Sequence, residues 1–390
     1  MKQQERFRCT IMRGGTSKGI YIMRNELPQD PEVRDRIILA IFGSPDIRQV
    51  DGLGGADLLT SKVAIIGPSS RADADVDYTF GQVGITEAKV DYTGNCGNIS
   101  SGVGPFTIIQ GLVDAVEPIT KVRIHMTNTK KVLAAEVPVK DGAPVIEGHY
   151  HIDGCPGTGA KITMDWSDTG GAVTGKILPT GHAKDVLNVG GMGQVTVSIV
   201  DAGNPIVFIQ AESLDMKGTE NPFEIDGDAV LLGKLERIRS AAAARLGFVK
   251  DWRKATKQSQ YAPFITMVNS PKNYVDYTTG KTIKADSFDI MARLLFNQRM
   301  HKTYPGSGTV CTGTAARIPG TIVNEFLSKS AKNRKEVRIG HPAGVIPIEV
   351  EVKMEGRKPI LRRAAIGRTA RIIMEGYVFV RKDLIYGSKK

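Results

Sequence analysis

Two cysteines stand in similar glycine-rich settings in the two halves of this chain. Cys96 lies within Asn95–Gly102, and Cys311 lies within Gly306–Thr314. Turn-forming residues precede each cysteine, and apolar residues at helical spacing follow it. The pattern predicts a loop that ends with a cysteine at a helix N-terminus, where free backbone N–H groups attract anions and favour a thiolate.

The surroundings of the two cysteines repeat as well. A glycine turn that enters an apolar strand precedes each of them, over Arg13–Ile22 and Asp201–Ile209. Each predicted helix also contains a proline, Pro105 or Pro319, which is unusual inside a helix. A repeated order of this kind predicts two similar domains. The boundary is expected within residues 184–193, which gives an N-terminal domain over 1–187 and a C-terminal domain over 188–375.

Composition fits a globular chain with many strands. The 390 residues include 43 glycines and are 41% hydrophobic, which is enough for a sizeable core. The net charge of +11 is spread along the chain, which favours a solvated surface and anionic ligands such as carboxylates. A basic nucleic-acid-binding protein is the alternative from another class, but no aromatic-basic module supports it.

Cysteine usage and hydropathy predict the compartment. The four cysteines form no Cys-x-x-Cys pair and no His-rich spacing, so no metal site is expected. The first residues contain no apolar signal segment, and no apolar run approaches the length of a membrane span. We therefore expect a cytoplasmic protein with reduced thiols and no membrane partner.

Hydrophobic periodicity and turn residues predict an α+β chain. Strands are expected over 7–12, 19–23, 62–66, 75–85, 122–126, 132–139, 195–199, 346–352 and 376–381. Helices are expected over 31–42, 228–246 and 286–300. The last of these would place His301 at a helix C-terminus, where the helix dipole favours a cation.

Three motifs resemble signatures of the diaminopimelate epimerase superfamily. They are Asn95-Cys-Gly-Asn98, Gly203-Asn-Pro205 and Cys311-Thr-Gly-Thr314. The resemblance implies two pseudo-symmetric domains, each a curved, mostly antiparallel sheet wrapped round a central helix, with a cleft between them. It also implies that the last strand, over 376–382, returns to the first domain.

Longer motifs are similar to one branch, the 2-methylaconitate isomerase-like proteins. These are Met12–Gly19, Leu58–Val63 and Ala316–Thr321. Within that branch, three further segments resemble methylitaconate isomerases: Gly43–Gly52, Ala74–Phe80 and His301–Tyr304. The likeness covers nearly the whole chain.

The resemblance assigns roles to individual residues. As catalytic residues it implies Lys62, Cys96, Ser17 and His301. As substrate-binding residues it implies Gly97, Asn98, Asn128, Asn204, Cys311, Thr312 and Gly313, with Arg13, Arg317 and Lys272 as further carboxylate partners. A buried lysine near other cations has a lowered pKa and can act as a base or an acid. Which of Lys62 and Cys96 removes the proton is left open.

The implied enzyme is an isomerase that needs no cofactor. A base removes an allylic proton from an unsaturated di- or tricarboxylate, and cationic groups stabilise the dienolate. Return of a proton at the far carbon moves the double bond, as in the conversion of 3-methylitaconate to 2,3-dimethylmaleate, which the motifs favour. The alternatives are cis-trans isomerisation of 2-methylaconitate and tautomerisation of 4-oxalomesaconate, with amino-acid epimerisation less favoured. Relatives imply a possible homo-oligomer.

Overall fold

The computed structural model describes residues 3–387, and internal contacts divide the chain into two compact units. Unit 1 combines the chain up to Met164 with the chain from Arg368 onward, and unit 2 is Asp165–Gly367. The division expected at 187 and 188 falls inside strand β12 (Asp185–Val189), which pairs with β13 (Gly193–Ala202) in unit 2. The segment predicted to be a domain boundary is therefore a β-hairpin, in which buried and exposed residues alternate along β12 before a glycine turn.

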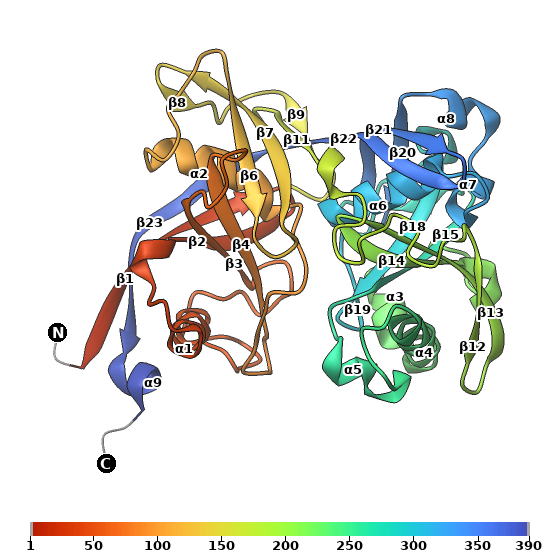
Figure 1. The fold of residues 1–390 in the computed structure, drawn as a ribbon, viewed down its shortest axis with the longest axis horizontal. Helices are drawn as coiled ribbons and strands as arrows, with labels where there is room; N and C mark the ends of the chain where they lie inside the picture. The colour runs from red at the N-terminus through yellow and green to blue at the C-terminus, as the bar shows by residue number, and fades with distance from the viewer. Residues whose placement is uncertain (1–2, 388–390) are drawn as a thin grey trace. The chain divides into compact units, whose positions relative to one another are not determined.

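Unit 1 contains a mixed sheet, a separate two-stranded sheet and several helices (Figure 1). Its strands are β1 (Gln4–Gly14), β2 (Ser17–Met23), β3 (Lys62–Pro68), β4 (Val76–Val83), β5 (Val90–Asp91), β6 (Ile119–Met126), β7 (Lys131–Lys140), β8 (Ala143–Pro144), β9 (Tyr150–His151), β10 (Thr158–Gly159), β11 (Ile162–Asp165, which ends in unit 2) and β23 (Ala370–Arg381). Its helices are α1 (Pro31–Phe42), the 3-10 turn η2 (Ile99–Gly102), α2 (Val103–Ile109) and α9 (Lys382–Tyr386).

Unit 2 has its own set of mixed strands, a separate two-stranded sheet and several helices. Besides β12 and β13, its strands are β14 (Asn204–Gln210), β15 (Phe264–Asn269), β16 (Tyr274–Val275), β17 (Thr282–Ile283), β18 (Ile290–Phe296), β19 (Arg299–Met300), β20 (Glu336–His341), β21 (Gly344–Glu355) and β22 (Lys358–Arg368). Its helices are α3 (Pro222–Gly227), α4 (Ala229–Arg245), α5 (Ala255–Gln258), α6 (Gly306–Arg317), α7 (Ile322–Phe326) and α8 (Lys329–Asn333).

The two sheets repeat one order of pairing. In unit 1, successive pairs of β1, β2, β3, β4, β6 and β7 alternate antiparallel, parallel, antiparallel, parallel, antiparallel. In unit 2, β13, β14, β15, β18, β20 and β21 follow the same alternation. The internal repeat predicted from the glycine turns is therefore present as a repeated sheet topology.

The outer helix of each unit begins where the sequence signals indicated. The Asp30 carboxylate accepts hydrogen bonds from the first turn of α1, and Gly43 ends this helix with a φ of 69°. Asp228 caps α4 in the same way. Each helix packs an apolar face onto one side of its sheet; in α1 this face is Ile37, Ile38, Ile41 and Phe42.

A buried helix covers the opposite side of each sheet. Residues 103–108 of α2 and residues 306–316 of α6 are all buried. Pro105 sits in the first turn of α2, and Pro319 follows the end of α6, so both prolines occupy positions that a helix tolerates. Cys311, expected at a helix start, instead lies in the middle of α6, because the helix begins at Gly306.

The predicted helix over 286–300 was wrong. Residues 290–296 form strand β18, which is buried throughout and pairs with both β15 and β20. Apart from Arg293 its residues are apolar, and a strand that is buried on both faces lacks the alternation that identifies a half-exposed strand. Asn297 and Gln298, both with positive φ, then form the tight turn into β19.

The two ends of the chain meet in unit 1. β23 runs antiparallel to β1 along the full length of β1, from Gln4 opposite Arg381 to Gly14 opposite Ala370. Figure 1 shows these strands side by side, in red and blue. The last strand expected over 376–382 thus completes the first sheet.

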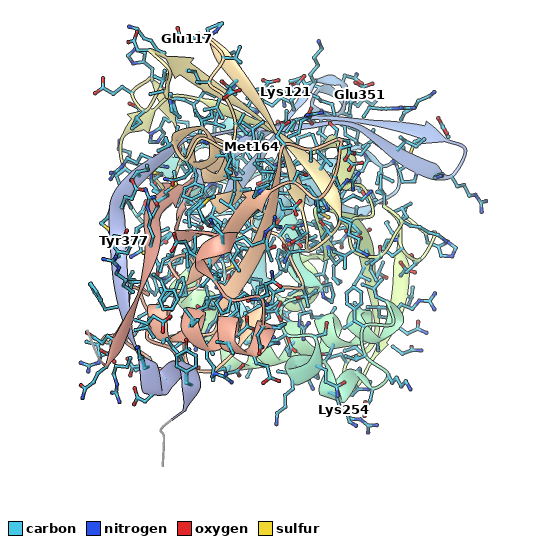
Figure 2. All side chains as sticks on the ribbon, turned by 60° about the vertical axis from the view of Figure 1, so that its left-hand side comes forward. Glu117, Lys121, Met164, Lys254, Glu351 and Tyr377 are labelled. Atoms are coloured by element: carbon cyan, nitrogen blue, oxygen red, sulfur yellow. The ribbon has the colours of Figure 1, made fainter. Side chains whose placement is uncertain are left out.

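The surface of both units is rich in charge, as Figure 2 shows with Lys121, Lys254 and Glu351, which are exposed, whereas Met164 is buried. On β6, exposed Lys121 alternates with buried Val122, as expected for a strand with one solvated face. Within residues 3–387, no helix is long and apolar enough to cross a membrane.

Glycines let both buried helices approach their sheets. A Cβ at Gly104 would lie 2.7 Å from Cγ2 of Val137, and a Cβ at Gly313 would lie 2.8 Å from Cγ2 of Ile348. Both neighbours are β-branched and stiff, so they cannot turn aside. Gly233 in α4 has no heavy atom within 4 Å of its Cβ position.

One substitution at three positions tests this packing. We expect Gly104→Ala and Gly313→Ala to lower the free energy of unfolding by about 1–3 kcal/mol through overpacking. Gly233→Ala should raise it by about 0.5–1 kcal/mol, because alanine is the better helix former in open space. Urea unfolding followed by circular dichroism measures all three, and equal effects would contradict the close packing of α2 and α6.

Candidate active site

Lys62 is a buried amine on the inner face of unit 1. It is the first residue of β3 and is only 4% exposed. Its Nζ donates a hydrogen bond to Oε1 of Gln82 at 2.7 Å and lies 5.4 Å from the ring centre of Phe80. Lys62, Gln82 and Phe80 share this face because β3 and β4 pair in register, with Lys62 opposite Gln82.

The Gln82 side chain is held in one orientation. Its Nε2 donates to the carbonyl oxygens of Ser61 at 2.9 Å and Leu58 at 3.3 Å. Its oxygen therefore faces Lys62 and accepts from the amine. A neutral acceptor serves an ammonium group and an amine equally, so Lys62 can change its protonation state in place.

The thiol of Cys96 lies beside Lys62. Burial lowers the pKa of Lys62, while the Cys96 charge, Asp57 and a hydrogen bond with the Cys96 side chain act in the opposite direction. The structure thus brings together the two residues that the sequence proposed as an acid-base pair. Both belong to unit 1.

Cys96 precedes a turn of 3-10 helix rather than the α-helix itself. It lies just before η2, and α2 begins only at Val103. The Cys96 carbonyl accepts from the backbone N–H of Ser100 at 3.1 Å and from its hydroxyl at 2.5 Å. Upstream, Nδ2 of Asn95 donates to Oγ1 of Thr129 at 3.0 Å, which ties the loop to the β6–β7 hairpin.

Two buried tyrosines surround the thiol. Burial raises the pKa of Tyr21 and of Tyr78 well above 10, and the Cys96 thiol adds to both shifts. Tyr21 donates its hydroxyl proton to the carbonyl of Ile99, which anchors η2 against β2. The neighbourhood of Cys96 is therefore dry, and its tyrosines remain protonated at neutral pH.

Two buried polar residues lie near the β1–β2 turn: Ser17, the first residue of β2, and Asn98, just before η2. Ser17 is 3% exposed and Asn98 is 1% exposed. Asn98 donates from Nδ2 to Oγ1 of Thr16 at 3.1 Å. Within the described part of the chain, Oγ of Ser17 and Oδ1 of Asn98 have no hydrogen-bond partner. Buried polar atoms of this kind are those that a bound ligand can satisfy.

Arg368 is a buried cation in this region that the sequence did not reveal. It is 2% exposed, and burial lowers its pKa to about 10, while Tyr150 and Cys96 act in the opposite direction. Gly15 lies against it, because a Cβ there would stand 3.1 Å from Cδ of Arg368. Arg13 is engaged elsewhere, since its Nη1 donates to the carbonyls of Gly15 and Thr369.

The other sequence candidates of unit 1 differ in their contacts. Gly97 is buried next to Cys96. Asn128 holds the fold: its Oδ1 accepts from the N–H of Phe80 at 2.9 Å, and its Nδ2 donates to the carbonyls of Phe80 at 2.8 Å and Tyr92 at 2.6 Å. The Asn128 amide therefore joins β4 to the segment before Cys96.

The remaining candidates belong to unit 2. Cys311 is fully buried, and its thiol donates to the carbonyl of Val200 at 3.1 Å; burial raises its pKa well above 9. The charge of Asp201 raises the pKa of this thiol further. Thr312 exchanges a hydrogen bond with the Tyr304 hydroxyl at 2.8 Å. Gly313 packs against β21.

His301 and Asn204 are buried polar residues of unit 2. His301 follows β19 rather than a helix, and its Nδ1 accepts the backbone N–H of Thr303 at 3.1 Å. This leaves Nε2 as the nitrogen that carries the proton of the neutral ring. Asn204 donates from Nδ2 to Oγ of Ser307 at 2.7 Å.

Two further carboxylate partners expected from the sequence have other roles. Arg317 donates to backbone carbonyls, among them those of Ala331 at 2.9 Å and Lys332 at 2.8 Å. Lys272 is paired with Glu212 at 3.4 Å on the surface of unit 2.

Matching glycine contacts align the two halves of the repeat. A Cβ at Gly14 would lie 2.7 Å from the carbonyl oxygen of Asn98, and a Cβ at Gly203 would lie 3.3 Å from Cβ of Ser307. Asn98 and Ser307 are therefore equivalent positions. Gly104 in α2 and Gly313 in α6 give the same alignment. Gly104 follows Asn98, and Gly313 follows Ser307, by the same number of residues.

In this register the chemistry of unit 1 has no counterpart in unit 2. Pro305 occupies the place of Cys96. Phe264 begins β15 as Lys62 begins β3, and its cross-strand neighbour is Phe296, with ring centres 5.7 Å apart. An aromatic pair thus replaces the amine and its amide acceptor.

Gln82 and Arg368 were missed by the sequence reading for different reasons. Gln82 lies two residues after Phe80 and four after Tyr78 on β4, so the period of a strand could have placed all three side chains on one face. Arg368 is the last residue of β22, directly after small residues, and only the tertiary fold brings it to Cys96.

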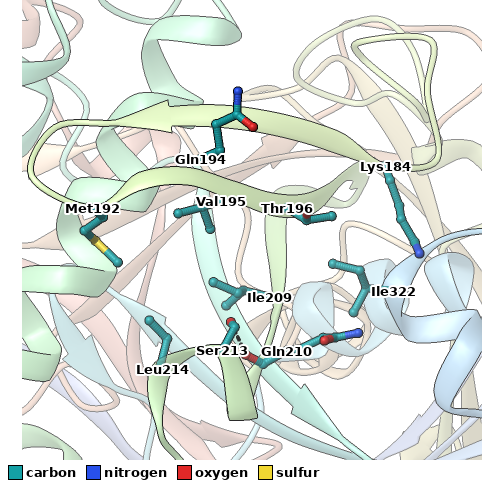
Figure 3. A pocket seen from close by; sticks show the side chains of 10 residues that line it. All are labelled: Lys184, Met192, Gln194, Val195, Thr196, Ile209, Gln210, Ser213, Leu214 and Ile322. Carbon is teal, nitrogen blue, oxygen red and sulfur yellow. Dashed lines mark hydrogen bonds between the residues drawn. The ribbon is translucent and has the colours of Figure 1, made fainter.

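A cavity of about 480 Å³ in unit 2 contains none of the predicted site residues (Figure 3). Its lining is apolar or neutral except for Lys184, which pairs with Glu325 at 2.5 Å. It offers no proton-transfer pair. Among the described residues, no group of three or more His, Cys, Asp or Glu side chains is arranged to hold a metal ion.

Comparisons with known proteins relate the whole chain to one family. The profile of the family described as PrpF protein matches residues 4–381. A 3-methylitaconate isomerase from Eubacterium barkeri is 55% identical over 382 residues, 98% of this chain and 99% of that protein. A 2-methyl-aconitate isomerase from Shewanella oneidensis is 38% identical over 387 residues, 96% of each chain. A 4-oxalomesaconate tautomerase from Pseudomonas putida is 38% identical over 387 residues, 99% of each chain.

Solved structures confirm the fold. The crystal structure of a methylitaconate-delta-isomerase, 55% identical, has a TM-score of 0.82 and covers 100% of this chain and 99% of its own. A hydroxyproline epimerase from Agrobacterium vitis, only 10% identical, has a TM-score of 0.55 over 98% of this chain and 93% of its own, and shows the fold alone. The predicted α+β class with two pseudo-symmetric, epimerase-like domains is therefore confirmed.

The lowered pKa of Lys62 predicts a pH-dependent stability. At pH values between the lowered pKa of Lys62 in the folded chain and 10.5, the ordinary pKa of a lysine, the unfolded chain binds more protons than the folded chain. The free energy of unfolding of the wild type should therefore rise with pH, relative to Lys62→Met, across this window. Denaturant unfolding at several pH values from neutral to 10.5 measures the difference.

The exposed Lys257→Met is the control for loss of one positive charge. A difference between wild type and Lys62→Met that stays constant with pH would contradict burial of the amine.

Proposed function

Because this chain belongs to the PrpF protein family, we propose that it isomerises an unsaturated dicarboxylate, converting 3-methylitaconate to 2,3-dimethylmaleate. The observation that carries the proposal is the contact between the Lys62 amine and the Cys96 thiol on a buried face of unit 1. The name and full-length identity of the Eubacterium barkeri relative support this substrate over 2-methylaconitate and 4-oxalomesaconate, whose isomerases are less similar to this chain.

The first step is removal of a proton. In 3-methylitaconate, the hydrogen on the carbon that carries the methyl group is acidified by the carboxylate on that carbon and by the adjacent alkene. Burial favours the neutral form of Lys62, so its lone pair is available as the base. The electron pair of the broken C–H bond passes into a dienolate that extends to the former methylene carbon.

The second step returns a proton at the other end of the dienolate. The thiol of Cys96 protonates the methylene carbon, which becomes the second methyl group of dimethylmaleate. Lys62 is then an ammonium group and Cys96 a thiolate. Proton transfer across their shared hydrogen bond restores both, so each turnover consumes and releases no net proton.

We further propose that these residues act without a cofactor and in a reducing cytoplasm. The acidity of the substrate and one acid-base pair suffice for a proton shift. Cys96 acts only as a free thiol, and all four cysteines are unpaired. The partner of this site is a small carboxylate anion, in keeping with the net charge of +11.

Cysteine substitutions test whether one thiol or two carry the reaction. Cys96→Ala should lower kcat by about 10²–10⁴-fold, the usual contribution of a positioned proton donor. Cys311→Ala, which removes a thiol enclosed in α6, should keep kcat within a few-fold of wild type. The absorbance of the conjugated product follows both rates. An equal loss in the two variants would contradict proton transfer confined to unit 1.

Deuterium labelling identifies the substrate. The purified protein in deuterium oxide should convert 3-methylitaconate to dimethylmaleate with deuterium in the newly formed methyl group, because the Cys96 thiol exchanges with solvent. Proton NMR measures this incorporation. Parallel incubations with 2-methylaconitate and 4-oxalomesaconate are the controls. Exchange with only one of these two compounds would assign this chain the isomerisation of that compound.

A further inference from the structure

Strand β23 lies at one end of the strand order in unit 1. Among the described residues, the paired order runs β23, β1, β2, β3, β4, β6 and β7. β23 therefore pairs with β1 along one edge, and its other edge ends this order. The strand has 12 residues, which is long for an edge strand. A long edge offers a row of backbone donors and acceptors to another strand.

The hydrogen bonds to β1 identify which backbone groups of β23 point outward. The N–H of Lys382, directly after β23, donates to the carbonyl of Gln3. In an antiparallel ladder, hydrogen-bonded pairs alternate with pairs that share no hydrogen bond, and this ladder is regular from 374 to 381. Even-numbered residues of this stretch therefore bond to β1. The N–H and C=O groups that point to the open edge belong to Glu375, Tyr377, Phe379 and Arg381.

The side chains of these four residues share the exposed face of β23, because successive residues of a strand alternate between its faces. Tyr377, labelled in Figure 2, is 51% exposed, and Phe379 is 45% exposed. On the other face, Val378 and Val380 pack into the core below α1. Two exposed aromatic rings beside an open strand edge mark an interaction surface.

A second copy of β23 matches this edge in one register. With a two-fold axis at Val378, Tyr377 lies opposite Phe379 of the second copy, and Glu375 lies opposite Arg381. Each pair occurs twice, because a two-fold interface is the same from both sides. All four residues have outward backbone groups, so the same register forms the hydrogen bonds of an antiparallel ladder. An axis at Tyr377 or at Gly376 would instead place Glu375 opposite an aromatic ring.

The charged groups keep atoms for this contact. Glu375 accepts from Nη2 of Arg8 at 2.6 Å and from Nε2 of Gln110 at 3.2 Å, and both bonds end on its Oε1. Arg381 donates to Asp383 through Nε and Nη2. Oε2 of Glu375 and Nη1 of Arg381 are therefore the atoms that can join two copies.

We propose that this chain forms a two-fold dimer through the open edge of β23, so that the unit 1 sheets of two copies become one sheet. The backbone hydrogen bonds provide affinity, while the aromatic and charged pairs set the register. The proposal concerns association and is independent of which carboxylate the enzyme isomerises.

Analytical ultracentrifugation of the full chain tests the dimer. Wild type should sediment with at least twice the mass of one chain. Arg381→Glu and Glu375→Arg each place like charges opposite one another at two points of the interface, and each should raise the dimer dissociation constant about 10- to 100-fold. Arg371→Glu is the matched control: it makes the same change at an exposed position of β23 outside the paired stretch, and should associate as wild type does.

Mixing the two single variants tests the register. A heterodimer of Arg381→Glu with Glu375→Arg regains both opposite-charge pairs, so an equimolar mixture should form dimers under conditions where each variant alone is monomeric. The double variant should also dimerise. Its new charges repel Arg8 and Asp383 of the same chain, so this recovery cannot come from contacts within one copy.

Circular dichroism and unfolding midpoints establish that each variant is folded. Four results would overturn the proposal: a monomeric wild type, single variants that associate as tightly as wild type, an equal loss of association in Arg371→Glu, or folded single variants whose mixture stays monomeric. Deuterium incorporation by wild type is measured separately, so a failed dimer leaves the proposed reaction standing, and a failed reaction leaves the dimer standing.

Discussion

Desolvation of one amine is the constraint on which the site depends. Lys62 is enclosed by the Phe80 ring, a neutral amide and the Cys96 thiol. The Gln82 oxygen accepts a hydrogen bond from Lys62 in either protonation state. The strand register that sets Gln82 opposite Lys62, and the carbonyls that orient its amide, therefore determine the chemistry as much as the reacting groups do.

The repeated topology is not accompanied by repeated chemistry. The strands of the two units pair in the same order, and each sheet carries a buried helix made possible by a glycine. Yet unit 2 has a proline at the position of Cys96 and two phenylalanines at the positions of the amine and its acceptor. A reaction that moves a proton between two carbons of one allylic system needs one acid-base pair, so one half can keep the fold while losing the reactive groups.

Local signals predicted what local physics decides. Asp30 and Gly43 bound α1 as their capping preferences indicate, and the motif around Cys96 lies on the face that Lys62 shares. The strand over 290–296 was mistaken for a helix because it is buried on both faces, so its sequence does not show the alternation of apolar and polar residues that identifies a strand. Cys311 was expected at the start of a helix because nothing in the sequence marks the true start at Gly306: the residue before it, Pro305, has no side chain that can cap α6.

The pairing of β1 with β23 has a consequence for the order of synthesis. Unit 2 is one continuous stretch and is complete when the ribosome has passed Gly367. At that point unit 1 is still incomplete. Its first segment ended at Met164, and it lacks Arg368 and the strand that pairs with β1. That strand, β23, closes the edge of β1 and is the last one to emerge. The unit that carries Lys62 and Cys96 is therefore completed at the end of translation, although both residues are made early.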